Sequence, residues 1–356
     1  MTAISLFLLA AIIALSLLIL KKQKGEDLRI YDGTNLPLMK KPNDISPAHN
    51  DLSEYFISKG KEPRPKSQAE LLIKTRQEMD SMFDDLEHNC QITPLEFDGM
   101  QAEWVCSEHS DPNRRLLYLH GGAFMFGSPR SHRPLTTYMA EKMGLSVLAI
   151  DYRLMPENRR LDGIEDCQKA WQYIIDNGPN ITGKATDYFV AGDSAGGSLC
   201  LMIAAWAENN SAVKPSAVIA FSPTTDSGLT SPSLKNNIDT DPMLAPLLKK
   251  IKYVPLPLLS AISAQQMKAS VFNPLVSPVR GSLSKLPPIL IQASRDETLI
   301  DDSIRYFNKA KQQGNDITLQ MWPKMVHVWQ IFHHQLPEGV EALEKVKEFI
   351  DSHSQH

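Results

Sequence analysis

The chain has 356 residues, 42% of them hydrophobic and 22% charged, and its formal net charge is −4. This length and apolar content suit a single α/β domain of about 300 residues with attachments, and they allow a sizeable buried core. The slight negative charge gives no electrostatic footprint for nucleic acid, so we expect no nucleic-acid partner. The four cysteines lack the spacing of metal ligands, which argues against a cysteine-held metal: Cys90, Cys106, Cys167 and Cys200.

The N-terminus is an apolar run. No charged residue lies between Thr2 and Leu20, and three lysines follow within four positions. As a helix, this run would be about 28 Å long, close to the hydrocarbon thickness of a bilayer. A cleaved signal peptide would carry positive charge before the run and a small-residue cleavage site after it, and this chain has neither. We therefore predict an uncleaved transmembrane anchor over residues 1–24, with residues 2–20 in the membrane.

The next segment has two parts, a polar stretch that contains prolines and a helix. Residues 25–65 are polar and contain five prolines, which favours an irregular linker. Ser67 and Glu70 then form a capping box, and the helix that they open is expected to end near His88. We predict that this helix, residues 66–90, packs as a cap over the active site, and its apolar stripe consists of Leu72, Met79, Phe83 and Leu86.

From residue 91 to residue 356, apolar runs of strand length alternate with segments of helical periodicity. A leading hairpin followed by this alternation predicts a mostly parallel, eight-stranded sheet with helices on both faces. Cys90 and Cys106 flank the hairpin and could pair only in an oxidising compartment. We expect strands near 92–98, 101–106, 116–119, 145–150, 187–191, 217–221, 289–293 and 317–322, and helices near 132–143, 161–177, 194–209, 301–313 and 338–353.

A glycine pair follows the third expected strand. The run ends in His120-Gly121-Gly122-Ala123-Phe124. Glycine at 121 and 122 lets the backbone turn its N–H groups toward a ligand without obstruction by a side chain. We expect His120 to brace this loop through its ring nitrogens.

A serine lies at the apex of the next tight turn. Gly192-Asp193-Ser194-Ala195-Gly196 joins an apolar strand to an apolar helix. In this context G-x-S-x-G is a nucleophile elbow, which holds the serine hydroxyl above the sheet. Glycines 192 and 196 are needed because strand and helix approach closely there. Together the two motifs predict acyl transfer at Ser194, with an oxyanion hole formed by the N–H groups of Gly121, Gly122 and Ala195.

An acidic residue follows the seventh expected strand. Asp296 lies just beyond its C-terminal end, where a loop carboxylate can turn toward the site, and we predict Asp296 as the acid of a catalytic triad. Glu297 is the closest rival. Asp301 and Asp302 also compete, but they fall where the next helix begins and have a structural function available there.

The catalytic base is predicted from chain order. His327 follows the last expected strand and precedes the closing helix, which completes the order Ser…Asp…His that this arrangement requires. In this assignment Ser194 attacks, His327 accepts and returns the proton, and Asp296 holds the imidazole in one tautomer. His333 and His334 fall within a helical stretch and are interpreted as structural.

These motifs together resemble the hormone-sensitive-lipase-like family of α/β-hydrolases, from about residue 90 to the C-terminus. The resemblance implies an α/β-hydrolase fold and hydrolysis of carboxylic esters of short or medium acyl chains, without metal or organic cofactor. Two departures are the alanine at 123, where many relatives have glycine, and Glu297, where proline is more familiar. The motifs that carry the resemblance are His120 to Phe124, Asp151 to Glu157, Gly192 to Gly197, Asn273 to Pro278, Asp296-Glu297 and His327.

The family also implies a second part of the cap, and we place this insertion near residues 235–270, where apolar residues precede Pro255 and Pro257. Amide, lactone or long-chain lipid hydrolysis would use the same acyl-enzyme chemistry and stays open. A non-catalytic small-molecule receptor on this fold is the alternative from another class. The lysines that follow the apolar run place the catalytic domain in the cytoplasm by the positive-inside rule, whereas some membrane-anchored relatives face the lumen.

Overall fold

The computed structural model describes residues 25–63, 65, 67–180, 182–249 and 253–355. The anchor predicted over residues 1–24 therefore lies outside the described residues. Within the part that is described, no helix combines the length and the apolar content needed to cross a bilayer.

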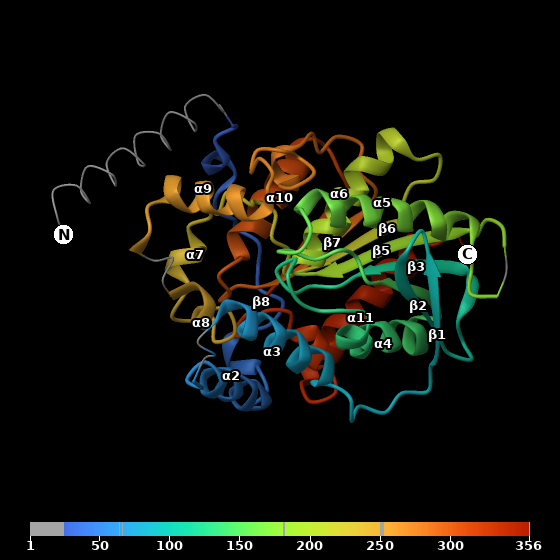
Figure 1. Cartoon of the computed structure of the whole chain (residues 1–356), viewed down its shortest axis with the longest axis horizontal. Helices are drawn as coiled ribbons and strands as arrows, with labels where there is room; N and C mark the ends of the chain where they lie inside the picture. The colour runs from blue at the N-terminus through green and yellow to red at the C-terminus, as the bar shows by residue number, and fades with distance from the viewer. Residues whose placement is uncertain (1–24, 64, 66, 181, 250–252, 356) are drawn as a thin grey trace.

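An eight-stranded sheet forms the centre of the molecule (Figure 1), as predicted. Two antiparallel strands lead at one edge, and the remaining strands are parallel to one another, so the order is β1-β2-β4-β3-β5-β6-β7-β8. Parallel strands bury both faces, which explains their nearly unbroken apolar sequences. The strands are β1 (Gln91–Phe97), β2 (Met100–Cys106), β3 (Asp111–Leu119), β4 (Leu145–Ile150), β5 (Asp187–Asp193), β6 (Ala217–Phe221), β7 (Ile289–Ser294) and β8 (Ile317–Trp322).

Helices cover both faces of the sheet (Figure 1). On one face α5 (Arg160–Asp176), α6 (Ala195–Asn210) and α10 (Ile300–Gln312) pack against strand residues such as Leu117. On the other face α4 (Arg133–Met143) and α11 (Pro337–Ser352) pack against strand residues such as Leu116, which precedes Leu117 in β3. Successive strand side chains point to opposite faces, so each strand contributes to both halves of the core.

Residues 25–65 are not the irregular linker that we predicted. They form two 3-10 turns, η1 (Leu28–Tyr31) and η2 (Pro42–Asp44), and a helix, α2 (Ala48–Lys59). The prolines flank these elements or lie at helix starts, where a missing N–H is tolerated, and so they do not prevent helix formation. The segment packs on the domain through side chains that bury apolar area: Leu28, Tyr31, Ile45 and Leu52.

The two segments predicted to form a cap, residues 66–90 and the insertion near 235–270, contain helices that lie near α2 (Figure 1). Ser67 caps α3 (Gln68–Ser81) by accepting from the Glu70 N–H at 3.1 Å, as the capping box predicts, but α3 ends before His88. The insertion near 235–270 contains α8 (Ala245–Leu248) and α9 (Leu256–Met267), and α7 (Ser233–Asn236) lies at its start. In Figure 1 these helices lie together at one end of the molecule.

The thiols of Cys90 and Cys106 are free, although the strand register brings Gln91 opposite Cys106. Burial raises the pKa of the Cys90 thiol to about 12. This keeps the thiol protonated and unreactive at neutral pH.

Candidate active site

The elbow around Ser194 has the strained backbone that the motif predicts. β5 ends at Asp193 and α6 begins at Ala195, so Ser194 alone makes the turn, with φ of 51° and ψ of −113°. Few residues other than glycine adopt a positive φ without cost, and such strain is concentrated at functional sites. Two hydrogen bonds hold the turn: the Ser194 N–H donates to the Phe221 carbonyl at 2.7 Å, and the Thr224 N–H donates to the Ser194 carbonyl at 3.2 Å.

The flanking glycines are required by close backbone contacts, as predicted. A Cβ at Gly196 would lie 1.8 Å from the carbonyl oxygen of Leu119, and one at Gly192 would lie 2.5 Å from the carbonyl oxygen of Gly196. No side chain can be accommodated at such distances. The elbow therefore brings β5, α6 and the end of β3 together around the serine.

His327 follows β8, as chain order predicted, but its hydrogen-bond partner is not Asp296. The Nδ1–H of His327 donates to Oε2 of Glu297 at 2.9 Å, and both side chains are buried. The carboxylate of Asp296 instead accepts from the Lys324 N–H at 2.6 Å, which holds the loop that follows β8. The assignment of the acid to Asp296 is thus corrected to Glu297, the rival one position along, because the Asp296 side chain turns toward the backbone of a neighbouring loop.

Electrostatics support this pair. Burial alone would lower the pKa of His327, but the hydrogen bond and the negative charge of Glu297 outweigh burial and raise it. Burial raises the pKa of the Glu297 carboxyl despite its contact with His327. Nε2 of His327 is buried and has no hydrogen-bond partner among the described residues. This nitrogen is therefore available to exchange a proton with a reacting group.

The rival acids have structural functions, although not at the start of their own helix. Asp302 accepts from the backbone N–H groups of Thr225 and Asp226 at 2.6 and 2.9 Å, and Asp301 accepts from the N–H of Ser233 at 2.7 Å. Both carboxylates thus fix the loop that follows β6.

One of the three predicted oxyanion donors is already engaged. The Gly121 N–H donates to Oδ1 of Asp193 at 3.0 Å, and a Cβ at Gly121 would lie 2.0 Å from Oδ2 of that carboxylate. The prediction that Gly121 is an oxyanion donor is therefore wrong, because its N–H already bonds to Asp193. Glycine is needed at this position because a Cβ would clash with the Asp193 carboxylate. Within the described residues, the N–H groups of Gly122, Ala123 and Ala195 make no hydrogen bond, and φ is 112° at Gly122 and 54° at Ala123.

Asp193 organises the back of the site, a function that sequence reasoning did not assign. Its buried carboxylate accepts from Tyr118 Oη at 2.7 Å and from His132 Nε2 at 3.3 Å, as well as from Gly121. Burial would raise the pKa of Asp193, but His132 and Tyr118 outweigh it and lower the pKa. His132 gives no sequence signal, because it lies in a short turn before α4, outside both motifs.

His120 braces the oxyanion loop as expected, although through one ring nitrogen only. Its Nδ1–H donates to the Gly121 carbonyl at 2.8 Å, and its ring stacks on Tyr152 with centroids 4.3 Å apart. Burial lowers the pKa of His120 to about 3, so the ring stays neutral. Behind the same loop, the buried guanidinium of Arg160 lies 3.6 Å from the ring centre of Phe124.

Helix α3 contacts the loops that follow β3 and β4. Arg76 of α3 donates to the carbonyl oxygens of Met125 and Met155 at 2.8 and 3.1 Å, and it forms an ion pair with Glu157. Met125 follows the oxyanion loop directly. His333 is a structural residue as expected, with Nε2 3.0 Å from the carbonyl oxygen of Pro134.

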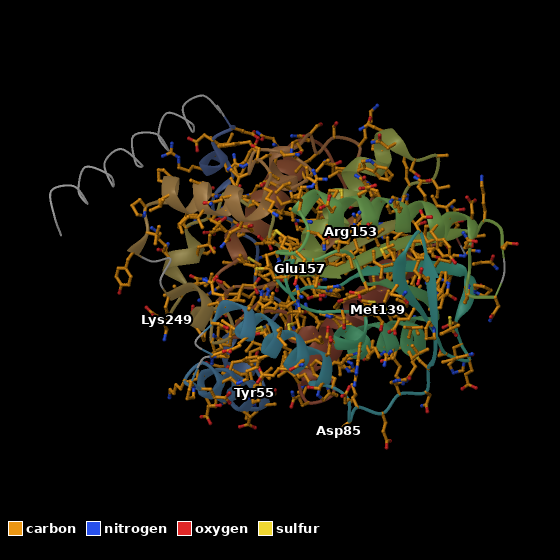
Figure 2. All side chains as sticks on the ribbon, viewed as in Figure 1. Tyr55, Asp85, Met139, Arg153, Glu157 and Lys249 are labelled. Atoms are coloured by element: carbon orange, nitrogen blue, oxygen red, sulfur yellow. The ribbon has the colours of Figure 1, made fainter. Side chains whose placement is uncertain are left out.

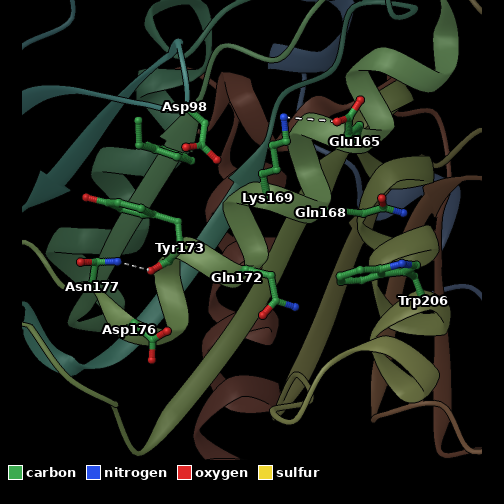
Figure 3. A pocket seen from close by; sticks show the side chains of 10 residues that line it. Asp98, Glu165, Gln168, Lys169, Gln172, Tyr173, Asp176, Asn177 and Trp206 are labelled. Carbon is green, nitrogen blue, oxygen red and sulfur yellow. Dashed lines mark hydrogen bonds and ion pairs between the residues drawn. The ribbon is translucent and has the colours of Figure 1, made fainter.

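A surface hollow of about 450 Å³ lies elsewhere on the molecule (Figure 3). It is lined mainly by α5, with Phe97 and Asp98 from the end of β1 and Trp206 from α6. None of the predicted catalytic residues lines it, and its lining contains no serine, cysteine or histidine. Among the described residues, no group of three or more His, Cys, Asp and Glu side chains is arranged to hold a metal.

The sequence matches a family model described as the alpha/beta hydrolase fold over residues 116–331. It is 33% identical to an acetyl-hydrolase of Streptomyces hygroscopicus over 255 residues, which cover 70% of this chain and 79% of that protein. It is 31% identical to an esterase of Acinetobacter venetianus over 264 residues, which cover 74% of this chain and 82% of that protein.

Solved structures of esterases are also similar to this chain. An esterase from the bacterial hormone-sensitive lipase family has a TM-score of 0.75 and 29% identity, with 88% of this chain and 99% of that one covered. The esterase EstE5, soaked with p-nitrophenyl butyrate, has a TM-score of 0.74 and 31% identity, with 86% and 99% covered. The similarity therefore extends beyond the catalytic motifs to most of the chain.

Proposed function

Since the chain belongs to the hormone-sensitive-lipase-like family of α/β-hydrolases and is a carboxylesterase, we propose that it hydrolyses short- to medium-chain esters through an acyl-enzyme intermediate on Ser194. The observations that support this mechanism are the buried His327–Glu297 pair, in which Nε2 of His327 has no partner among the described residues, and the strained backbone of the elbow at Ser194. We assign Ser194 as nucleophile, His327 as general base and acid, and Glu297 as the carboxylate that orients His327.

In the first half of the reaction, Ser194 Oγ attacks the carbonyl carbon of the ester while its proton passes to Nε2 of His327. The carbonyl π electrons move onto the oxygen and give a tetrahedral oxyanion. When this intermediate collapses, the carbon–oxygen bond to the alcohol breaks, and His327 returns the proton to the departing alkoxide. The acyl group stays on Ser194.

In the second half, water takes the place of the alcohol. His327 accepts one proton of the water, the resulting hydroxide attacks the acyl carbon, and a second tetrahedral oxyanion forms. Its collapse breaks the bond to Ser194 Oγ, which regains the proton from His327, and the carboxylic acid leaves. Glu297 accepts from Nδ1–H throughout, so the neutral ring keeps its lone pair on Nε2 and the imidazolium is stabilised when it forms.

The developing oxyanion requires donors that do not have to reorganise. We assign these donors as the N–H groups of Gly122, Ala123 and Ala195, and each is expected to contribute about 3 kcal/mol to transition-state stabilisation. Ala195 is at the start of α6, where the first N–H groups lack intrahelical partners and the helix dipole favours negative charge.

The proposed acyl range is supported by the relatives. One of them is an acetyl-hydrolase, and EstE5 was soaked with a butyrate ester. Hydrolysis of p-nitrophenyl esters from acetate to palmitate, by wild type and Ser194→Ala, tests both chemistry and range. We expect activity that peaks at a short or medium chain and is lost in Ser194→Ala. A Ser194→Ala variant that keeps wild-type turnover, or a wild type that prefers the longest chain, would overturn the proposal.

We also propose that residues 2–20 tether the enzyme to a membrane, with the catalytic domain on the cytoplasmic side. The support is the uncharged run of bilayer length and the lysines that follow it. The full chain should sediment with membranes after alkaline extraction, and Ile12→Arg with Leu15→Arg should release it, whereas Thr2→Arg should not. Protease accessibility of the domain in sealed membranes tests the orientation.

A further inference from the structure

The described surface carries its exposed apolar side chains in an uneven distribution. Ten large hydrophobic residues are exposed, and all of them lie before residue 83 or between residues 247 and 262. The sheet and its covering helices contribute none of them. Scattered exposed hydrophobic residues are common, but their concentration on one part of a protein marks an interaction surface.

Four of these residues lie on or next to α8 and α9, and we call them the α9 patch: Leu247, Tyr253, Leu256 and Ile262, which are 58%, 85%, 40% and 41% exposed. From Val254 to Met267 the sequence contains no charged residue. Apart from two serines and two glutamines, the side chains of α9 are apolar, and a helix of this kind is normally buried in a core or in lipid. Yet α9 buries only part of its circumference, through Leu259, Ser260 and Met267.

The place where the chain enters the described structure indicates what covers this patch. Gly25 directly follows the N-terminal segment and packs against Phe272, five residues beyond the end of α9: a Cβ at Gly25 would lie 2.3 Å from the Phe272 ring. Glu26 fixes this entry point, since it pairs with the Lys309 ammonium at 2.5 Å. The proposed membrane segment, residues 2–20, thus joins the domain close to α9.

The residues around the patch suit the headgroup layer. Lys249 and Lys268 are exposed on either side of α9, and Tyr253 precedes it. Lysine and tyrosine are side chains that place an apolar part toward lipid and a polar end in the interface. Figure 2 shows Lys249 beside α8, on the side of the molecule that holds the cap.

The patch is also connected to the catalytic serine. Ser260 and Ser263 of α9 donate to the carbonyl oxygens of Gly228 and Ser227 at 2.6 and 2.7 Å. Both carbonyls belong to the loop after β6, and Thr224 of the same loop donates to Ser194. α9 therefore lies directly on a loop that forms part of the active site.

We propose that the α9 patch docks on the surface of the bilayer that holds residues 2–20, so that the cap receives ester substrates from the lipid phase. The inference rests on the proposed membrane tether but goes beyond it, because a tether alone leaves the orientation of the domain free. The occupant is the lipid surface itself, and not the apolar N-terminal run or another protein.

A fluorescence measurement on the full chain in phosphatidylcholine vesicles tests the contact. Tyr253→Trp places a reporter in the patch, and Tyr55→Trp on α2, 40% exposed, is the matched control (Figure 2). We expect the added emission of Trp at 253 to be quenched by acyl-brominated lipid and that of Trp at 55 to be unaffected. Unquenched emission at 253 in a vesicle-bound chain overturns docking and leaves the tether standing. A chain that does not bind vesicles at all overturns both proposals.

Kinetics provide the second readout. Leu256→Asp with Ile262→Asp should reduce hydrolysis of a long-chain ester dissolved in the vesicles by about tenfold and leave hydrolysis of water-soluble p-nitrophenyl acetate within about twofold of wild type. The matched control is Ile57→Asp with Ile73→Asp, on α2 and α3, which should affect neither ester. Equal losses on both esters, or the same losses in the control pair, would overturn the proposal. A blue-shifted reporter at 253 without lipid would instead identify the N-terminal run as the occupant.

Discussion

The two sides of the active site are built in different ways. On one side, the loops after β3 and β5 are shaped by backbone contacts, and glycines are required there because a Cβ would lie as close as 1.8 Å to a carbonyl oxygen. On the other side, the loops after β7 and β8 are shaped by side chains: Glu297 meets His327, and Asp296 meets a backbone N–H. Steric limits restrict the first side to few residue types, whereas either of two neighbouring carboxylates could serve on the second.

The largest predicted effect tests the side of the active site that side chains shape, the loops after β7 and β8. Glu297→Gln should reduce kcat by about 10³- to 10⁴-fold, because the amide cannot hold His327 in the reactive tautomer or stabilise its charge. Asp296→Asn is the matched control and should cost less than about tenfold, since it affects only the loop at Lys324. Steady-state kinetics on p-nitrophenyl butyrate measure both, and the reverse order of the two losses would restore Asp296 as the acid.

The next prediction tests the side that backbone contacts shape, at Gly122 in the loop after β3. Alanine there would place a Cβ 2.3 Å from the Phe126 carbonyl oxygen at a φ of 112°, so the loop must shift and misplace its donors. We expect kcat to fall by about 100-fold. Gly99→Ala is a control with φ of 75° and open space around the new Cβ, and it should leave kcat unchanged. A normal kcat in Gly122→Ala would exclude this loop from the oxyanion hole.

A smaller effect is expected at Asp193, whose hydrogen bonds hold the loop after β3 in place. Asp193→Asn removes the charge that holds His132 and should destabilise the fold by about 2–3 kcal/mol and lower kcat by about tenfold. Asp166→Asn, which weakens the pair between the buried Asp166 and the exposed Arg153 away from the site, should reduce stability without lowering kcat. Urea unfolding and kcat measured on both variants distinguish support of the loop from general stability.

The smallest effect is a change in pH dependence. His327 must be neutral to accept a proton, so kcat/KM falls as the pH decreases through its pKa. Glu297 raises that pKa, and the acid limb of wild type should lie above the ordinary histidine value of about 6.5. In Glu297→Gln, burial lowers the pKa of His327 without the compensating charge, so the acid limb of the kcat/KM profile should move to lower pH. Asp296→Asn should keep the wild-type profile. An unchanged limb in Glu297→Gln would contradict the pairing.

The sequence alone was sufficient for the fold, and its motifs were sufficient to propose the nucleophile and the base. Apolar periodicity predicted the eight strands, and the motifs predicted Ser194, His327 and the glycines, since an elbow and an oxyanion loop tolerate few other residues. Tertiary structure decided which of two adjacent carboxylates meets His327, that Asp193 occupies the Gly121 N–H, and that residues 25–65 pack on the domain. These features depend on where loops from different strands meet, to within one residue and about one ångström. Local sequence patterns do not specify the distances between such loops.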